Sequence, residues 1–444
     1  MPKIWQGGAS GDSSTSLNRL MVEDDVSVDQ HLEEYEVLTL MAYHREIHRR
    51  NLIPCKESSS IAKSLLKLLQ APLKLDPGLE DVHGNVEEFV LKDAGIAGKN
   101  LRIFLSRNEQ SHTDIILFIN DHILELARLC NATALTILAK RDTVSGPMPG
   151  YTHYRQAMVI SAVSYLDFLA SQFEYLARDL IERVSRIRVL PFGYGSGFGQ
   201  VTDIDFRNVA SYLGFEHPPL NPMFLASRRG MDEAEFLMAG VGIMTVLSRI
   251  SQDLIIFSGD ELPLFILPEG FTTGSSLMAN KRNPDFLEMV QGYASMLLGH
   301  SQSALGIVLN KSSGYHRDFQ ITKLLAVRSA LLIEEILKRV NDLFHGLKFN
   351  AEASISAIKN SSYATANALM SFNRGIPWKD AYAETGKKIR EGKKLVEIEP
   401  AEMRTVSLEE LKEIEDRITS MQERNDAFRK DLISAMEEIA TSSC

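Results

Sequence analysis

The sequence predicts an all-α protein built around a central bundle of long helices. Apolar residues recur three and four positions apart over long stretches, as they do between Ile116 and Ala134, and this spacing places them on one face of a helix. Strand-like alternation is nearly absent, and the one weak strand pattern lies at 266–267, just before Pro268. Helices of about 25 to 35 residues bury such stripes only by packing lengthwise, so a bundle is expected.

Five long helices are expected in chain order, separated by short segments rich in Gly, Ser and Pro. The helices lie at about 116–134, 154–188, 233–257, 286–308 and 324–340. The intervening loops lie at 145–151, 191–199, 269–276 and 311–315. Loops on a rigid scaffold are where functional residues concentrate.

The chain is long enough for several domains. We expect an N-terminal helical domain at 1–105, a central long-helix bundle domain at 106–345 and a C-terminal helical domain at 346–444. The stretch 407–440 within the last domain is strongly charged, and it predicts a solvated amphipathic helix at the surface.

The composition argues against several classes of protein. Hydrophobic residues make up 44% and charged residues 24% of the chain, which is ordinary for a soluble globular protein. The net charge of −10 argues against general binding to nucleic acid or to anionic membranes. No apolar signal-peptide core and no uninterrupted apolar run of about 18 residues is visible. Cys55, Cys130 and Cys444 form no CxxC motif, so we expect free thiols in a reducing cytoplasm.

The most informative segment is the loop and helix start at 270–288. Asn283 predicts a helix N-cap, and Pro284 suits the first turn because the amide that proline lacks has no partner there. A helix N-terminus beside Lys281 predicts a carboxylate site. Ser275 and Ser276 add hydroxyls on a glycine-hinged loop that could close over a bound anion, although a polar loop with an ordinary cap is the alternative.

The stretch Gly-Ser-Ser-Leu-Met-Ala-Asn-Lys-Arg-Asn-Pro at 274–284 resembles the signature of the fumarase/aspartase superfamily, commonly GSSxMPxKxNP. The resemblance implies the three-domain fumarase/aspartase-like fold. It implies that Ser275 is the base that removes a proton from the carbon beside a carboxylate, and that Lys281 and Asn283 bind that carboxylate. Ala279 stands where the family usually has proline, which affects the loop rather than a reacting group.

Further segments resemble one branch, the argininosuccinate lyases, in the same chain order. They are KIWQGG at 3–8, EDVH at 80–83, SRNEQ at 106–110, MPGYTH at 148–153, the 193–199 loop and GIPWKDAY at 375–382. YHRDFQITK at 315–323 discriminates best, because it resembles YNKDLQEDK. The resemblance implies that Tyr315, Gln320 and Lys323 contact substrate, and it makes His83 a further candidate.

The resemblance also pairs His153 with Glu288. A carboxylate partner raises the proton affinity of an imidazole, which suits general-acid assistance to a departing amine. Arg107 and Asn108 would present a guanidinium and an amide to a carboxylate, and Thr152 would add a hydroxyl. Taken singly, His153 is better interpreted as a polar loop residue, and Arg107 is equally well interpreted as a surface arginine.

Together these segments imply the β-elimination of argininosuccinate to fumarate and L-arginine in arginine biosynthesis. The resemblance implies a homotetramer in which each site draws residues from three subunits. The expected partners are a small-molecule substrate and further copies of the chain. No metal or organic cofactor is expected, because no ligand cluster with zinc or iron spacing appears.

Three alternatives stay open. The first is another fumarate-releasing lyase that acts on adenylosuccinate, aspartate or another N-substituted succinate, and the Lys-Arg-Asn-Pro spelling at 281–284 also occurs among adenylosuccinate lyases. The segments 315–323 and 106–110 argue against it. The second is an inactive structural homologue like the lens crystallins of this family, and the third is an unrelated helical scaffold. Neither would need Ser275, Lys281 and Glu288 together.

Overall fold

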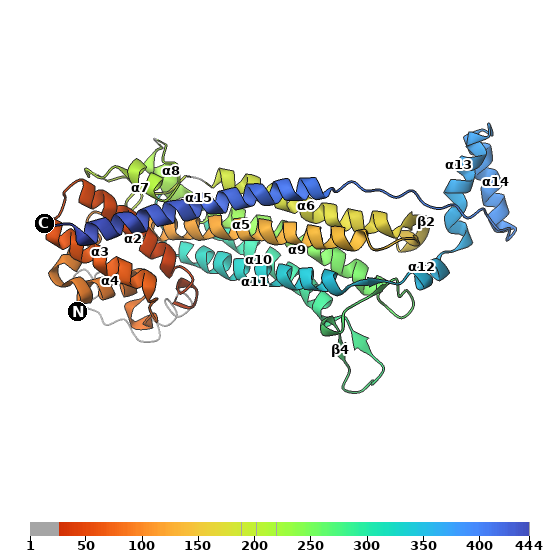
Figure 1. Cartoon of the computed structure of the whole chain (residues 1–444), viewed down its shortest axis with the longest axis horizontal. Helices are drawn as coiled ribbons and strands as arrows, with labels where there is room; N and C mark the ends of the chain where they lie inside the picture. Colours follow the sequence, from red (N-terminus) through yellow and green to blue (C-terminus); the bar gives the residue numbers. More distant parts are fainter. Residues whose placement is uncertain (1–25, 188, 201, 219, 444) are drawn as a thin grey trace.

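The long helices of the chain lie side by side in an elongated bundle (Figure 1). The computed structural model describes residues 26–187, 189–200, 202–218 and 220–443, so the KIWQGG segment and Cys444 lie outside it. The predicted all-α class is confirmed. The five long helices expected from the apolar spacing are α5 (Arg107–Arg141), α6 (Ala162–Arg186), α9 (Met231–Phe257), α10 (Asp285–Val308) and α11 (Phe319–Gly346).

The core of the bundle is one continuous apolar cluster contributed by these helices. Ile119, Leu166, Ile243 and Ala326 are each 0% exposed, so the stripes inferred from the spacing do face inward. By length and composition alone α5 and α9 could cross a membrane, but 61% and 56% of the relevant windows are buried inside the structure. Such burial is typical of core helices in a bundle.

A β-hairpin replaces the first turns of the helix that was expected from 154. Strands β1 (Pro147–Thr152) and β2 (Arg155–Ser161) pair antiparallel, with Thr152 opposite Arg155. His153 and Tyr154 form the two-residue turn, and both have positive φ, 53° and 55°. This turn matches the twist of the strands, so the chain reverses here and α6 begins only at Ala162. The prediction of a helix from 154 was therefore wrong over its first eight positions.

A second apolar core lies at one end of the bundle. It is built by α2 (Glu33–Arg49), α3 (Cys55–Gln70), α4 (Val82–Ala94), η3 (Gly95–Asn100), α7 (Phe206–Tyr212) and the end of α15 (Leu408–Thr441). The short helices η2 (Pro77–Leu79) and α8 (Pro222–Ser227) lie nearby. Cys130 is a free buried thiol as expected, whereas Cys55 is disulfide-bonded, so that part of the expectation was wrong.

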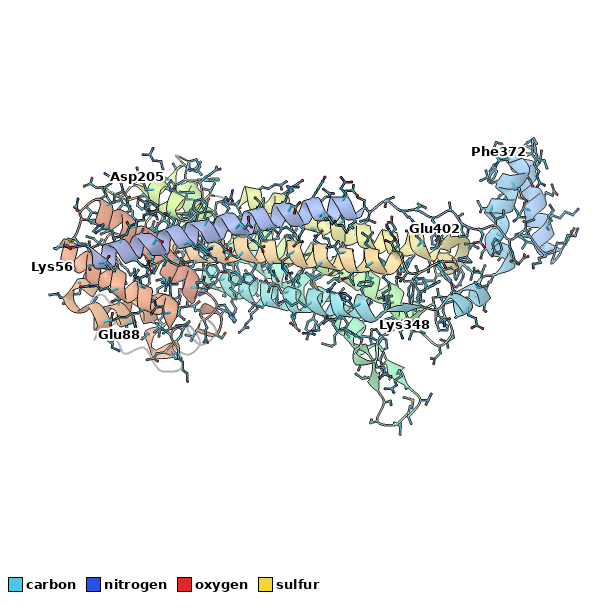
Figure 2. All side chains as sticks on the ribbon, viewed as in Figure 1. Lys56, Glu88, Asp205, Lys348, Phe372 and Glu402 are labelled. Carbon is cyan, nitrogen blue, oxygen red and sulfur yellow. The ribbon has the colours of Figure 1, made fainter. Side chains whose placement is uncertain are left out.

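The chain after α11 leaves the bundle and then returns to it. After β6 (Lys348–Phe349), α12 (Ala351–Ala357), η5 (Asn360–Tyr363), α13 (Ala364–Asn373) and α14 (Trp378–Arg390) form a small unit at the far end of the rod. Figure 2 shows Phe372 on this unit, away from the bundle. Helix α15 (Leu408–Thr441) then runs back along the bundle.

The last helix buries one stripe and exposes the rest. Leu411, Ile414, Ile418, Leu432 and Met436 of α15 are each 0% exposed, and the helix packs on α3 and α5. The amphipathic helix expected at 407–440 is thus present, but it packs on the N-terminal helices and on the central bundle rather than on α13 and α14. The division into three domains at 105 and 345 remains a prediction.

Candidate active site

The loop that carries Ser275 projects from the side of the bundle (Figure 1). It follows β3 (Phe265–Ile266) and η4 (Glu269–Phe271), and its base is a two-stranded ladder of β4 (Thr273–Gly274) and β5 (Arg282–Asn283). Ser275 is half-buried, whereas Ser276 is exposed and Leu277 is 88% exposed. The ladder holds the two ends of the loop together, and its tip extends into solvent.

The Ser275 hydroxyl faces amide donors of its own loop. Its Oγ accepts hydrogen bonds from the amides of Leu277 at 3.3 Å and Met278 at 3.0 Å. Donors directed at an oxygen favour its negatively charged form, which is the form that a base requires. No described acid or base of the same chain accepts the Ser275 proton.

The cations that the signature predicts lie at the base of this loop. Lys281 and Arg282 are exposed and, with Asp260 and Asn280, they line a cavity of about 460 Å³. Asn283 is half-buried in β5 rather than at a helix cap, so that prediction was wrong. Helix α10 begins after Pro284 without any side-chain cap, because the pairing of Thr273 with Asn283 keeps residue 283 extended.

The proposed acid pair is not joined in one chain. His153 and Thr152 are exposed at the tip of the β1–β2 hairpin, and Glu288 is exposed in the first turn of α10. Among the described residues no hydrogen bond or ion pair links His153 to Glu288. Their pairing therefore stays a prediction.

The remaining candidates lie at the opposite end of the bundle, around the start of α5. Arg107 and Asn108 occupy its first turn, and Ser106 is the N-cap. The Arg107 guanidinium lies 3.4 Å from Asp81, 3.5 Å from Glu80 and 3.6 Å from Glu87. Arg107 thus lies among acids of its own chain, and its contact with a substrate carboxylate stays a prediction.

Tyr315, Gln320 and Lys323 flank the start of α11 at the same end. The Gln320 amide donates to the Tyr315 hydroxyl at 3.2 Å, so these two side chains form one polar unit. Lys323 is 2% exposed and forms an ion pair with Asp29. The neighbouring Arg317 donates to Glu80 at 2.8 Å.

The two groups of candidates are far apart within one chain. Helix α5 has 35 residues, and at 1.5 Å per residue it spans about 50 Å between Arg107 and the hairpin that bears His153. One copy therefore presents half of the predicted site at each end of the bundle.

The structure gives the candidate His83 buried partners that the sequence did not show. His83 Nδ1 lies 3.0 Å from Glu36 and 3.7 Å from Asp114, and all three side chains are buried. Among the described residues, these three side chains are the ones whose ligand atoms lie close enough together to hold a cation. A proton on Asp114 can also neutralise part of the negative charge of this cluster, because burial and the charge of Glu36 raise the pKa of the Asp114 carboxyl. These partners come from three helices, so no local pattern signals them.

Glu109 is a second buried hub, and it does have a local signal. It completes the capping box Ser106-x-x-Glu109 of α5, a pattern that sequence alone can show. Its carboxylate also accepts from the amides of Gly193 at 2.8 Å and Gly195 at 3.0 Å.

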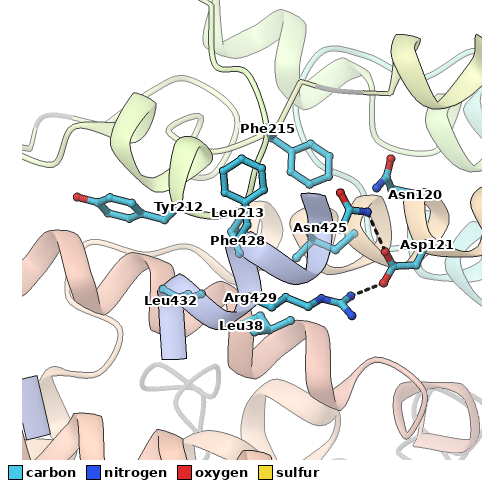
Figure 3. Close-up of a pocket in the computed structure, with 11 residues that line it drawn as sticks. Leu38, Asn120, Asp121, Tyr212, Leu213, Phe215, Asn425, Phe428, Arg429 and Leu432 are labelled. Carbon is cyan, nitrogen blue, oxygen red and sulfur yellow. Dashed lines mark hydrogen bonds and ion pairs between the residues drawn. The ribbon is translucent and has the colours of Figure 1, made fainter. Parts of the chain in front are cut away.

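A separate small cavity lies where α15 crosses α5 and α2, and it contains none of the candidate residues (Figure 3). Asp121 accepts there from Arg429 and Asn425, and Tyr35 donates to Asp121 at 3.1 Å. These contacts tie the last helix to the bundle, so the cavity is part of the scaffold.

Comparison with known proteins agrees with the sequence signature. A model of the lyase family matches residues 16–299. Argininosuccinate lyase of Sorangium cellulosum is 35% identical over 401 residues, which is 87% of this chain and 90% of that protein. Argininosuccinate lyase of a Sulfurihydrogenibium species is 30% identical and covers 93% of this chain and 89% of that protein.

Solved structures share the fold at lower identity. EDDS lyase in complex with formate has a TM-score of 0.71 at 19% identity and covers 99% of this chain and 96% of its own. Fumarate lyase:delta crystallin from Brucella melitensis bound to cobalt has a TM-score of 0.72 at 15% identity and covers 89% of this chain and 91% of its own. The chain is therefore a carbon–nitrogen lyase that belongs to the argininosuccinate lyase family of the fumarase/aspartase superfamily.

Proposed function

We propose that this lyase catalyses the reversible β-elimination of argininosuccinate to fumarate and L-arginine, as a step of arginine biosynthesis in the cytoplasm. The observation that carries the proposal is the projecting loop in which the Ser275 oxygen faces two backbone amides, with Lys281 at its base. The argininosuccinate lyases that resemble this chain over most of its length support the choice of substrate.

In the proposed reaction the Ser275 side chain, in its deprotonated alkoxide form, takes the proton from the carbon beside one carboxylate of the succinyl group and becomes a hydroxyl. The electron pair of that C–H bond is held on the carboxylate, where Lys281 and Asn283 stabilise the added charge. The pair then forms the carbon–carbon double bond of fumarate while the C–N bond breaks. The departing nitrogen keeps the electrons of the C–N bond and takes a proton, for which His153 oriented by Glu288 is the proposed donor.

Two sequence segments at the α5 end support argininosuccinate over adenylosuccinate. Residues 106–110 and 315–323 resemble the SRNDQ and YNKDLQEDK segments of argininosuccinate lyases. The structure brings the two segments to the same end of the bundle, at the starts of α5 and α11.

We further propose that the enzyme is a homotetramer whose sites are shared between subunits. The candidate residues of one chain lie about 50 Å apart along α5, so a complete site needs a second copy. Exposed apolar side chains on α9 and α10 offer a surface for such contacts, namely Met238, Met289, Met296, Leu298 and Leu305. An interface that buries them gains hydrophobic free energy.

The proposal is tested by the release of fumarate, followed by its ultraviolet absorbance. We expect turnover of argininosuccinate and none of adenylosuccinate. Ser275→Ala should lower kcat by at least about 10²-fold, while Ser420→Ala, an exposed serine on α15, should leave it unchanged. Turnover of adenylosuccinate alone, or full activity of Ser275→Ala, would refute the proposal.

A further inference from the structure

Glu109 makes more contacts than its place in a capping box requires. It is fully buried, and its Oε1 accepts from the Ser106 amide at 3.0 Å, which is the capping bond. Its Oε2 accepts from the amides of Gly193 and Gly195, and the Gln200 side chain donates to Oε1. A capping box needs only the first of these bonds, so the other three serve the loop at 193–199.

The loop has the backbone shape of an anion receptor. Gly193, Gly195 and Gly197 have φ values of 88°, 57° and 131°, a region that glycine adopts without a steric penalty. Successive amides in such conformations converge on a negative charge, and here that charge is the carboxylate of Glu109. Burial raises the pKa of the Glu109 carboxyl, and the hydrogen bonds from Ser106, Gly195 and Gly193 oppose this rise.

The clamped loop touches both elements that carry the predicted substrate contacts at this end. The Tyr194 hydroxyl donates to the backbone carbonyl of Asn108 at 2.8 Å. A Cβ built on Gly197 would lie 3.2 Å from the Gly314 Cα and 3.8 Å from the Tyr315 amide nitrogen. The loop therefore lies between the first turn of α5 and the segment that leads into α11.

A second capping box in the chain provides a matched comparison. Glu410 at the start of α15 accepts from the Ser407 amide at 3.1 Å, as Glu109 does from Ser106. Within the part of the chain that the structure describes, its hydrogen bonds join it to Ser407 and to no distant loop. The additional bonds of Glu109 thus do not follow from capping. The argininosuccinate lyase segment that residues 106–110 resemble reads SRNDQ, with aspartate in place of Glu109. An aspartate carboxylate would sit back by one carbon–carbon bond, about 1.5 Å.

We propose that Glu109 is a positioning residue that clamps the 193–199 loop onto the first turn of α5 and thereby sets the separation of Asn108 and Tyr315. The proposal rests on the proposed function in one respect, that Asn108 and Tyr315 contact substrate. The clamp itself is a property of the chain and can be measured without substrate.

The test compares Glu109→Gln with Glu410→Gln. Both changes weaken a capping box, but only the first places an amide group opposite the Gly193 and Gly195 donors. We expect amide hydrogen exchange of the segment 190–200 to rise by about 10-fold or more in Glu109→Gln and to stay unchanged in Glu410→Gln. With argininosuccinate, Glu109→Gln should raise KM about 10-fold while kcat falls less than about threefold. Equal effects of the two variants, or no effect of either, would overturn the proposal.

A second pair of variants keeps the test decisive if Glu109→Gln does not fold. Gly197→Ala and Gly392→Ala both place a side chain at positive φ, but a Cβ at Gly392 meets nothing within 4 Å. Gly197→Ala should raise KM and Gly392→Ala should not. A wild-type enzyme that releases no fumarate from argininosuccinate would refute the proposed function, whereas the exchange measurement would still decide whether Glu109 holds the loop.

Discussion

Whether a candidate side chain is available to bind substrate depends on the ion pairs and hydrogen bonds that it already makes within the chain. Lys323 is held by Asp29, 294 positions away, and Arg107 by the acids at 80, 81 and 87. Such pairs arise from tertiary packing, so the motif that marks Lys323 and Arg107 could not show them. Ser275 was identified because its motif is local. The SxxE pattern that ends at Glu109 is local as well, so the capping box could have been predicted from the sequence, although its bonds to the distant 193–199 loop could not.

One carboxylate anchors the point where the chain returns to the bundle. Asp167 on α6 accepts from Thr405 and Val406 just before α15 and forms an ion pair with Arg141. Burial acts to raise the pKa of Asp167, but the hydrogen bonds from Thr405, Arg141 and Val406 outweigh it and lower the pKa below its usual value.

Asp167→Asn is therefore predicted to destabilise the protein in a pH-dependent way. A lowered folded-state pKa contributes stability that is present above the unfolded-state pKa and is lost as the pH falls through the folded-state pKa. Asp167→Asn should cost about 3 kcal/mol at pH 7, and the difference from wild type should shrink in acid. Asp142→Asn removes an exposed partner of the same arginine and should cost less than about 1 kcal/mol. Urea unfolding at pH 7 and pH 3 measures both, and a pH-independent loss at residue 167 would contradict this account.

The periodicity of apolar residues predicted whole elements correctly where the burial of side chains decides the structure. The five long helices follow from apolar spacing because their stripes face one core. The β1–β2 hairpin was missed because its turn uses His153 and Tyr154 in the left-handed region, without the Gly or Asn that usually marks such a turn. The cap at Asn283 was wrong because the β4–β5 ladder takes that residue.

The turn predicts an unusual effect of glycine. Tyr154 is 77% exposed and has a φ of 55°, so Tyr154→Gly removes backbone strain of about 1 kcal/mol and little packing. It should raise the melting temperature by about 1 °C, because the entropy of unfolding of about 2.1 cal/mol/K per residue is large for a chain of 444 residues. Tyr175 is 72% exposed on α6, and Tyr175→Gly should lower the melting temperature because glycine weakens a helix interior. Destabilisation by both changes would mean that the turn is not strained.

The whole molecule is a long rod with half of a predicted site toward each end. The projecting loop at the base of α10 carries Ser275 and Lys281, and the tip of the β1–β2 hairpin carries His153. Toward the other end of the rod, the first turn of α5 carries Asn108, and Tyr315 lies just before α11. The sequence identified these residues, but it could not show that helix α5 separates them. The rod shape and the exposed apolar side chains of α9 and α10 are the physical reasons to expect association.

Mixing two inactive variants tests shared sites most directly. Ser275→Ala and Asn108→Ala are each expected to be nearly inactive alone. After the two are unfolded and refolded together, sites that combine an intact Ser275 from one copy with an intact Asn108 from another should restore fumarate release to about a quarter of the wild-type rate. Activity of the mixture no greater than that of the separate variants would contradict the account.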